Sequence, residues 1–378
     1  MKPICLITGG SGFVGGRLIE SLLAHGWQVR ALARSDKAMQ IVDKLGAQAV
    51  RGSLGDFASL TAAVHGCTVV VHVAALFKLW GDRDEFEQAN VQGTANLLRA
   101  ASEASVKRFV QVGAAAVVMG DLVPMLQANE SLPTQERAWA PYSASKARSE
   151  ALVLGANSPG VFETVVVRPA MIWGAGMPTL DHMIETVRAG QFRWVGDGSQ
   201  AMSTSHVDNV CHVVELAIDK GRGGEAYFVS DGADSTLKQV MSGLLQTRAV
   251  EPPHASAPLP VAWVLASVME WIWRVFSRPG EPPITRQMLR LIGLPFTLDT
   301  CGSSWSSSRS SSGANGISPP ASTCSHSTRV FFLKTSLSIV AILSYSRTRS
   351  KRAGNSVTHS GRPIVLQSDC QNLSGDDR

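Results

Sequence analysis

The sequence predicts an α/β fold, in which a doubly wound parallel sheet carries helices on both faces and a small C-terminal lobe follows. Short apolar runs alternate with segments of helical periodicity through the first 300 residues, a pattern typical of parallel sheets covered on both faces. A glycine-rich turn joins the first apolar run to the first helical segment. The chain has 378 residues, of which 44% are apolar, enough to bury a large core.

The expected elements follow in chain order. Residues 3–8 form an apolar run that ends in glycines, which indicates a buried strand. Residues 17–25 carry leucine and isoleucine at helical spacing, and Gly26 can end this helix. Four further strands and one further helix are expected, at residues 28–33, 69–73, 109–112 and 164–167 and at residues 91–101 respectively.

Charge, apolar run length and cysteine spacing exclude several classes of protein. Residues 1–300 contain 26 basic and 27 acidic residues, so we expect no nucleic-acid partner. No apolar run is long enough for a membrane-spanning helix, and the N-terminus lacks the features of a signal peptide. The six cysteines have neither metal-ligand nor C-x-x-C spacing. We therefore expect reduced thiols, no metal site and a cytoplasmic location.

Residues 301–378 differ from the rest of the chain. They contain 21 serines, nine basic residues and three acidic residues. Such a composition cannot bury enough apolar surface to offset the loss of chain entropy. We expect this tail to be disordered, or to be an out-of-frame C-terminus created by a coding frameshift. A regulatory segment or one that binds an anionic partner is the alternative.

The segment Thr8–Gly15 has the form of a phosphate cradle. Gly9, Gly12 and Gly15 fit the spacing G-x-x-G-x-x-G between a strand and a helix. The first glycine allows a tight turn, the second lets backbone approach a pyrophosphate at the helix N-terminus, and the third lets helix pack on strand. An ordinary glycine-rich turn is the alternative. The strand before the motif and the helix after it favour a dinucleotide cofactor.

The end of the second expected strand bears on the choice between NAD and NADP. An acidic residue there binds the ribose 2′-hydroxyl of NAD. This chain has no acid until Asp36, and Arg34 could pair with a 2′-phosphate. A solvated surface charge is the alternative for Arg34. The charge pattern therefore favours NADP over NAD.

Tyr142 and Lys146 are the candidate catalytic pair. They are four residues apart, so they share one face if the segment is helical. A tyrosine pKa near ~10 is too high for a general base at neutral pH, and a nearby ammonium group lowers it. We expect Tyr142 to exchange a proton with a hydroxyl or carbonyl group while nicotinamide exchanges hydride. An exposed helical pair is the alternative.

Together these motifs resemble the extended short-chain dehydrogenase/reductases, the NAD-dependent epimerase/dehydratase family. The matching segments occur in family order at residues 8–15, 72–75, 90–98, 142–146, 168–176 and 206–210. The resemblance implies a Rossmann-type sheet that binds the dinucleotide and a small substrate lobe. We expect residues 1–165 to form the dinucleotide-binding core, and residues 166–300 to form the remaining core strands and the substrate lobe.

The family pattern also assigns roles to individual residues. It implies catalysis by Tyr142 and Lys146. It implies cofactor binding by Thr8, Gly9, Gly12, Phe13, Val14, Gly15, Arg34, Ser53, Leu54, Ala74, Ala75, Asn96, Tyr142, Lys146 and Pro169.

Within the family, the chain most resembles the 3β-hydroxysteroid dehydrogenase and dihydroflavonol reductase branch. Residues 282–286 and 224–232 carry this resemblance. It implies interconversion of a secondary alcohol and a ketone on a steroid-like or flavonoid-like small molecule. Residues 259–276 are almost wholly apolar and contain three tryptophans. They could line a pocket or contact a membrane surface, but a buried helix is the favoured alternative. The sequence leaves open whether the protein forms a homodimer.

Three departures from the family pattern stand out. The segment Gly113–Ala116 lacks the hydroxyl that normally polarises the substrate oxygen. Ser53 replaces an aspartate that commonly contacts adenine. The family pattern stops near Thr300, so the substrate lobe is expected to lack its last helices.

Two rival functions remain at this stage. A nucleotide-sugar epimerase or dehydratase uses the same cradle and the same tyrosine and lysine, but it needs a polar substrate lobe. A non-catalytic dinucleotide-binding protein would explain the missing hydroxyl. It would not explain why the activated tyrosine is present.

Overall fold

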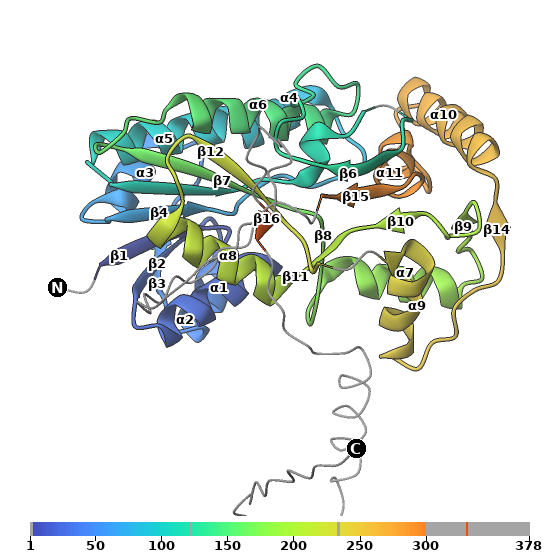
Figure 1. The fold of residues 1–378 in the computed structure, drawn as a ribbon, viewed down its shortest axis with the longest axis horizontal. Helices are drawn as coiled ribbons and strands as arrows, with labels where there is room; N and C mark the ends of the chain where they lie inside the picture. Colours follow the sequence, from blue (N-terminus) through green and yellow to red (C-terminus); the bar gives the residue numbers. More distant parts are fainter. Residues whose placement is uncertain (1–2, 121, 233–234, 300–329, 332–378) are drawn as a thin grey trace, which may run out of the picture. The chain divides into compact units, whose positions relative to one another are not determined.

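The computed structural model describes residues 3–120, 122–232, 235–299 and 330–331, all within one compact unit. Its centre is an eight-stranded sheet in the order β16-β12-β7-β5-β4-β1-β2-β3, with every neighbouring pair parallel (Figure 1). The strands are β1 (Ile4–Thr8), β2 (Gln28–Ala33), β3 (Gln48–Arg51), β4 (Val69–His72), β5 (Arg108–Val112), β7 (Glu163–Pro169), β12 (Glu225–Val229) and β16 (Val330–Phe331). The strand order reverses between β1 and β4, which creates a crevice at the carboxyl ends of the strands.

Helices cover both faces of this sheet, as the alternation of strands and helices predicted (Figure 1). One face packs against α1 (Phe13–Ala24), α2 (Asp36–Lys44) and α8 (Val207–Lys220). The other packs against α3 (Phe57–Val64), α5 (Gly93–Glu103) and α6 (Pro141–Gly155). Successive strand residues point to opposite faces. Accordingly, Cys5 and Ile7 of β1 pack on the first face and Leu6 on the second.

The expected elements are present, with shifted ends. Helix α1 begins at Phe13 rather than at residue 17, because Gly12 is its N-cap and the glycine motif forms its first turn. The helix expected at residues 91–101 is α5, and a π-helical segment at Glu87–Gln92 precedes it. Of the tail at residues 301–378, the structure describes only β16. The expectation of disorder or of a frameshift otherwise lies outside the described residues.

A second group of elements forms the C-terminal lobe. Its helices are α7 (Pro178–Arg188), α9 (Leu237–Gln246), α10 (Leu259–Val275) and α11 (Arg286–Ile292). A four-stranded sheet has the order β13-β10-β15-β6 and consists of β13 (Ser235–Thr236), β10 (Ala201–Met202), β15 (Phe296–Leu298) and β6 (Met125–Ala128). Two-strand sheets pair β8 (Met171–Trp173) with β11 (Thr204–His206) and β9 (Trp194–Val195) with β14 (Ser256–Ala257). The strand β6 comes from the first half of the chain, so the lobe is not built from residues after 165 alone.

Candidate active site

The turn between β1 and α1 accepts only glycine at its key positions. Gly9 has φ = 75°, and a Cβ atom there would lie 2.8 Å from the backbone nitrogen of Ala74. A Cβ atom on Gly15 would lie 2.7 Å from the carbonyl carbon of Gly9. Gly12 donates its N–H to the Gly9 carbonyl at 3.0 Å and, as N-cap, supplies no side-chain cap. The first N–H groups of α1 can therefore face an anion.

A cavity of ≈ 1510 Å³ extends from this turn along the carboxyl ends of the strands and into the lobe. Fourteen of the fifteen residues predicted to bind cofactor line it: Thr8, Gly9, Gly12, Phe13, Val14, Gly15, Arg34, Ser53, Leu54, Ala74, Ala75, Tyr142, Lys146 and Pro169. Asn96 does not line the cavity. Its side-chain Nδ2 donates to the carbonyl of Leu54 at 2.9 Å, so Asn96 holds a lining residue in place.

The charge of the cavity wall suits a nicotinamide dinucleotide. The cations on the wall are Arg34, Lys37, Lys146 and Arg193, and none of the described lining residues is Asp or Glu. Asp36 is exposed and forms an ion pair with Arg51. The glycine turn, the open helix N-terminus and this cationic wall together fit the phosphates of such a cofactor.

Tyr142 and Lys146 lie on α6, as the four-residue spacing predicted, and both line the cavity. Lys146 is buried, and its Nζ donates to the carbonyl of Val112 at 2.9 Å. Burial lowers the pKa of Lys146 to about 8, although the nearby Glu150 opposes this shift. The ring of Phe77 packs edge-on against the ring of Tyr142, with centroids 4.9 Å apart.

Burial raises the pKa of Tyr142 to about 12. The expected lowering of this pKa by Lys146 is therefore wrong for this structure. The physical reason is that burial penalises the phenolate, while the ammonium group is bonded to a backbone carbonyl. Tyr142 thus keeps its proton at neutral pH, and this form can donate a proton to a carbonyl oxygen.

Two residues of α11, which sequence reasoning missed, hold the first turn of α6. The Oε1 atom of Gln287 accepts the N–H of Tyr142 at 3.2 Å. Arg290 is buried and donates to the hydroxyl of Ser143 at 2.6 Å. Both lie just beyond the segment 282–286, whose family resemblance was the available signal. The lobe therefore contacts the helix that carries Tyr142 directly.

A buried polar network behind the cavity joins β1, β4 and α5. The His72 ring bonds to the Thr8 hydroxyl through Nδ1 at 2.7 Å and to the Thr94 hydroxyl through Nε2 at 2.9 Å. The Thr8 hydroxyl also accepts the backbone N–H of Ala74, which lines the cavity. Burial first, and the charge of Lys146 second, lower the pKa of His72 to about 3. His72 is therefore neutral at physiological pH.

The lowered pKa of His72 predicts a loss of stability in mild acid. The unfolded chain takes up a proton near its ordinary pKa of 6.5, whereas the folded chain resists until about 3. The free energy of unfolding should thus fall as the pH drops through 6.5, by about 2 kcal/mol between pH 7 and 5. Urea unfolding at both values measures this loss. His72→Gln should remove most of it and the exposed His65→Gln little; equal pH dependence in all three proteins would contradict the assignment.

Comparison with known proteins supports a specific family. The sequence pattern of the 3-beta hydroxysteroid dehydrogenase/isomerase family matches residues 6–260. The chain belongs to this family.

Two named sequence relatives are a ketoreductase and a dehydrogenase. The chain is 42% identical over 294 residues to a 4-hydroxy-2-methyl-3-oxo-4-farnesyl-3,4-dihydroquinoline-1-oxide ketoreductase from Stigmatella aurantiaca, over 78% of this chain and 87% of the relative. It is 30% identical to a decarboxylating sterol-4-alpha-carboxylate 3-dehydrogenase from Dictyostelium discoideum, over 79% and 93% of the two chains. A dTDP-glucose 4,6-dehydratase from Streptomyces venezuelae, solved with NAD bound, superposes with a TM-score of 0.58 at 25% identity, over 68% and 84%.

These relationships place the chain among the NAD(P)-dependent oxidoreductases of the extended short-chain type, in the 3β-hydroxysteroid dehydrogenase branch. The rival of a non-catalytic binding protein finds no support among these named relatives. The departure at Gly113–Ala116 is located at the site itself: all four residues line the cavity and present no hydroxyl to it. This part of the cavity wall therefore lacks the hydroxyl that the family resemblance led us to expect.

Proposed function

We propose that this oxidoreductase uses NADPH to reduce the ketone of a large apolar substrate, with Tyr142 as the proton donor. The observation that carries the proposal is the composition of the lobe end of the cavity. This wall is rich in flexible methionines and aliphatic side chains, namely Met171, Met177, Met183, Met202, Met241, Leu265, Ile284, Met288, Leu291 and Ile292. Methionine side chains adapt to irregular apolar shapes. Such a wall suits a bulky hydrocarbon-like scaffold.

Tyr142 and Lys146 account for the proton chemistry of the proposed reduction. Nicotinamide supplies the hydride when the dinucleotide is bound. Tyr142, with a pKa of about 12, holds the proton that the developing alkoxide needs. Lys146, with a pKa of about 8, is positively charged at neutral pH, and its Nζ donates to the carbonyl of Val112. Carbonyl, hydride and proton together give the secondary alcohol.

The names of two relatives support an apolar substrate. The Stigmatella aurantiaca relative is named for a ketone substrate that carries a farnesyl group. The Dictyostelium discoideum relative is named for a sterol. Both names describe large and mainly hydrocarbon molecules, in agreement with the methionine-rich wall.

The rival substrate class, nucleotide sugars, is disfavoured by the cations of the lobe. A nucleotide sugar carries a diphosphate, which needs free cationic or N–H donors. Arg193 is the one arginine among the described lining residues after residue 170. Its Nη1 atom donates to the carbonyls of Gly190 and Phe192, both at 2.8 Å. Nη1 of this guanidinium group is thus engaged by backbone carbonyls.

Cofactor binding tests this proposal first. We expect NADPH to bind at least about tenfold more tightly than NADH, because Arg34 and Lys37 line the cavity and no acidic lining residue is described. Arg34→Ala should weaken NADPH binding by about tenfold or more and change NADH binding little. Fluorescence titration of both cofactors measures this. Lys44→Ala removes one positive charge outside the cavity and serves as the matched control. Equal loss for both cofactors in Arg34→Ala would contradict a 2′-phosphate contact.

A further inference from the structure

The first turn of α6 has no side-chain cap of its own. Its N-cap is Ala140, which supplies no side-chain hydrogen bond, and Pro141 at the first helical position has no N–H group. Tyr142 therefore carries the first backbone N–H group of the helix. Helix ends fray unless such groups find partners. Tyr142 lies in this end turn, whereas Lys146 lies about one turn further along.

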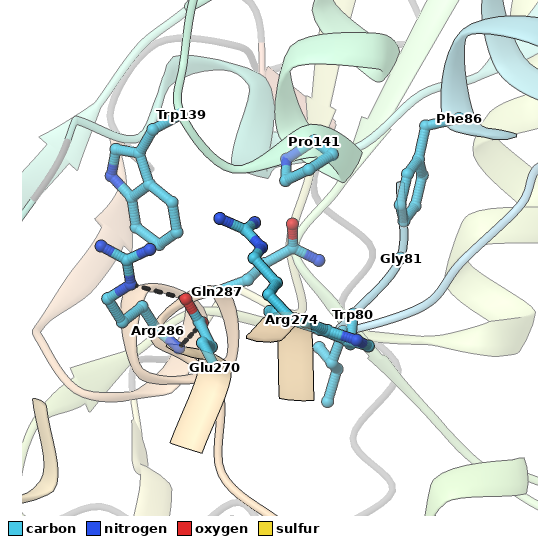
Figure 2. A pocket seen from close by; sticks show the side chains of 10 residues that line it. Trp80, Gly81, Phe86, Trp139, Pro141, Glu270, Arg274, Arg286 and Gln287 are labelled. Carbon is cyan, nitrogen blue, oxygen red and sulfur yellow. Dashed lines mark hydrogen bonds and ion pairs between the residues drawn. The ribbon is translucent and has the colours of Figure 1, made fainter. Parts of the chain in front are cut away.

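Gln287 of α11 supplies the missing cap from 145 positions away. Its side chain is buried, its Oε1 atom accepts the N–H of Tyr142 at 3.2 Å, and its Nε2 atom donates to the carbonyl of Lys78 at 2.7 Å. Figure 2 shows the amide of Gln287 pointing toward Pro141, the first residue of α6. Each end of the amide meets a complementary backbone group, so its orientation is fixed.

The same amide also holds the segment that carries the packing partner of the Tyr142 ring. Phe77 directly precedes Lys78, and its ring packs edge-on against that of Tyr142. Both aromatic rings belong to residues that line the cavity. Gln287 is not among the described residues that line it. Its effect on a substrate would therefore pass through Tyr142.

Helix α11 is itself fixed at both ends. At its start, the buried carboxylate of Glu270 accepts the backbone N–H and the Nε–H of Arg286, each at 2.7 Å (Figure 2). Near its end, the buried guanidinium group of Arg290 donates to the carbonyl of Met119 and to the hydroxyl of Ser143. These contacts keep α11 against α6 and against the cavity wall, so Gln287 is held at a fixed place.

We propose that Gln287 is a positioning residue for the proton donor and that α11 links the substrate wall to it. The inference rests on the proposed role of Tyr142. Met288 and Leu291 of α11 line the cavity, while Gln287 and Arg290 bond to the first turn of α6. One short helix thus forms part of the substrate wall and sets where the Tyr142 hydroxyl lies. A misplacement of about 1 Å near a reacting group can cost about a hundredfold in rate.

Gln287→Leu tests the assignment, because it removes both hydrogen bonds and keeps a side chain of similar size. With androstanedione as the probe ketone and NADPH as cofactor, we expect kcat to fall by about tenfold to a hundredfold. The Kd for NADPH should change by less than about threefold, because the cofactor turn is untouched. Added to Tyr142→Phe, the same substitution should lower the residual kcat by less than about twofold, because no hydroxyl is left to position. A merely structural role would give the same loss in both backgrounds.

Two further variants serve as controls. Gln239 also accepts a backbone N–H at a helix start, that of Thr236 at 2.9 Å, but on α9. Gln239→Leu should therefore leave kcat within about twofold of the wild type. Gln287→Glu keeps an acceptor for the N–H of Tyr142, and Arg274 and Arg286 line the same small pocket and favour its charge (Figure 2). This conservative variant should retain at least about a third of kcat.

Hydrogen exchange of the Tyr142 amide tests the bond without turnover. In Gln287→Leu this amide should exchange at least about tenfold faster than in the wild type, and in Gln239→Leu at an unchanged rate. Gln287→Asn, which withdraws the amide by one methylene, provides the same comparison if Gln287→Leu does not fold. Unchanged exchange overturns the proposal, as does an equal loss of kcat with and without the Tyr142 hydroxyl. Full activity of Tyr142→Phe alone would instead refute the proposed function.

Discussion

Tyr142→Phe should reduce kcat for a ketone substrate by about 10²- to 10⁴-fold, the usual contribution of a positioned proton donor. The substitution removes only the hydroxyl. The ring that packs against Phe77, and with it the wall of the cavity, is retained. The Kd for NADPH should therefore change by less than about threefold. Steady-state kinetics and fluorescence titration on the same preparation measure both quantities.

Tyr227→Phe is the matched control for this experiment. Tyr227 is buried outside the cavity, and its hydroxyl accepts the backbone N–H of Arg222 at 3.0 Å. Its loss should lower stability slightly and leave kcat within about twofold of the wild type. Retention of more than about a tenth of kcat in Tyr142→Phe would show that another group donates the proton.

Gly15→Ala should abolish high-affinity cofactor binding, with a loss of at least about a hundredfold in Kd. The new methyl group would meet the Gly9 carbonyl, at 2.7 Å from its carbon, and the Cα atom of Gly10 at 3.0 Å. All of these atoms belong to the backbone of the phosphate turn, so the turn itself must move. Because the turn also connects β1 to α1, the melting temperature should fall as well. Calorimetric titration with NADPH and a thermal scan measure the two effects.

The adjacent glycine provides a control of opposite sign. A Cβ atom on Gly16 would lie 3.5 Å from the nearest atoms, the Gly10 carbonyl oxygen and a methyl of Leu45, which is ordinary contact. Gly16→Ala within α1 should therefore stabilise the fold by about 0.5–1 kcal/mol and leave NADPH binding unchanged. If Gly15→Ala bound NADPH as well as Gly16→Ala does, the glycine turn would not be the phosphate cradle.

Local patterns predicted the parts of the site that are close in sequence. The glycine turn could be predicted because strand, turn and helix are consecutive in the chain. The shared face of Tyr142 and Lys146 follows from a spacing of four residues on α6. Ala74, Ala75 and Pro169, which the family resemblance assigned to the cofactor, line the cavity because the carboxyl ends of parallel strands meet at one edge.

Contacts between distant segments could not be predicted in this way. Asn96 bonds to Leu54 across 42 positions, and Gln287 bonds to Tyr142 across 145 positions. No local pattern specifies such partners, because they depend on how the lobe packs on the sheet. The direction of the Tyr142 pKa shift could not be predicted from local patterns either, because it depends on the burial of the phenol.

The sequence by itself determined the sheet with its two helical layers, the glycine turn and the place of Tyr142 and Lys146 on one helix. Periodicity and spacing specify these features within short stretches of chain. Only the tertiary structure decided which side of α10 is covered. This helix is apolar almost all round, so periodicity cannot select a buried face. The expectation of a buried helix at residues 259–276 is wrong, because only Ala262, Ala266 and Glu270 of α10 (Leu259–Val275) are buried. The buried carboxylate of Glu270 bonds to Arg286, while large apolar side chains of the helix such as Val264 and Trp271 are exposed.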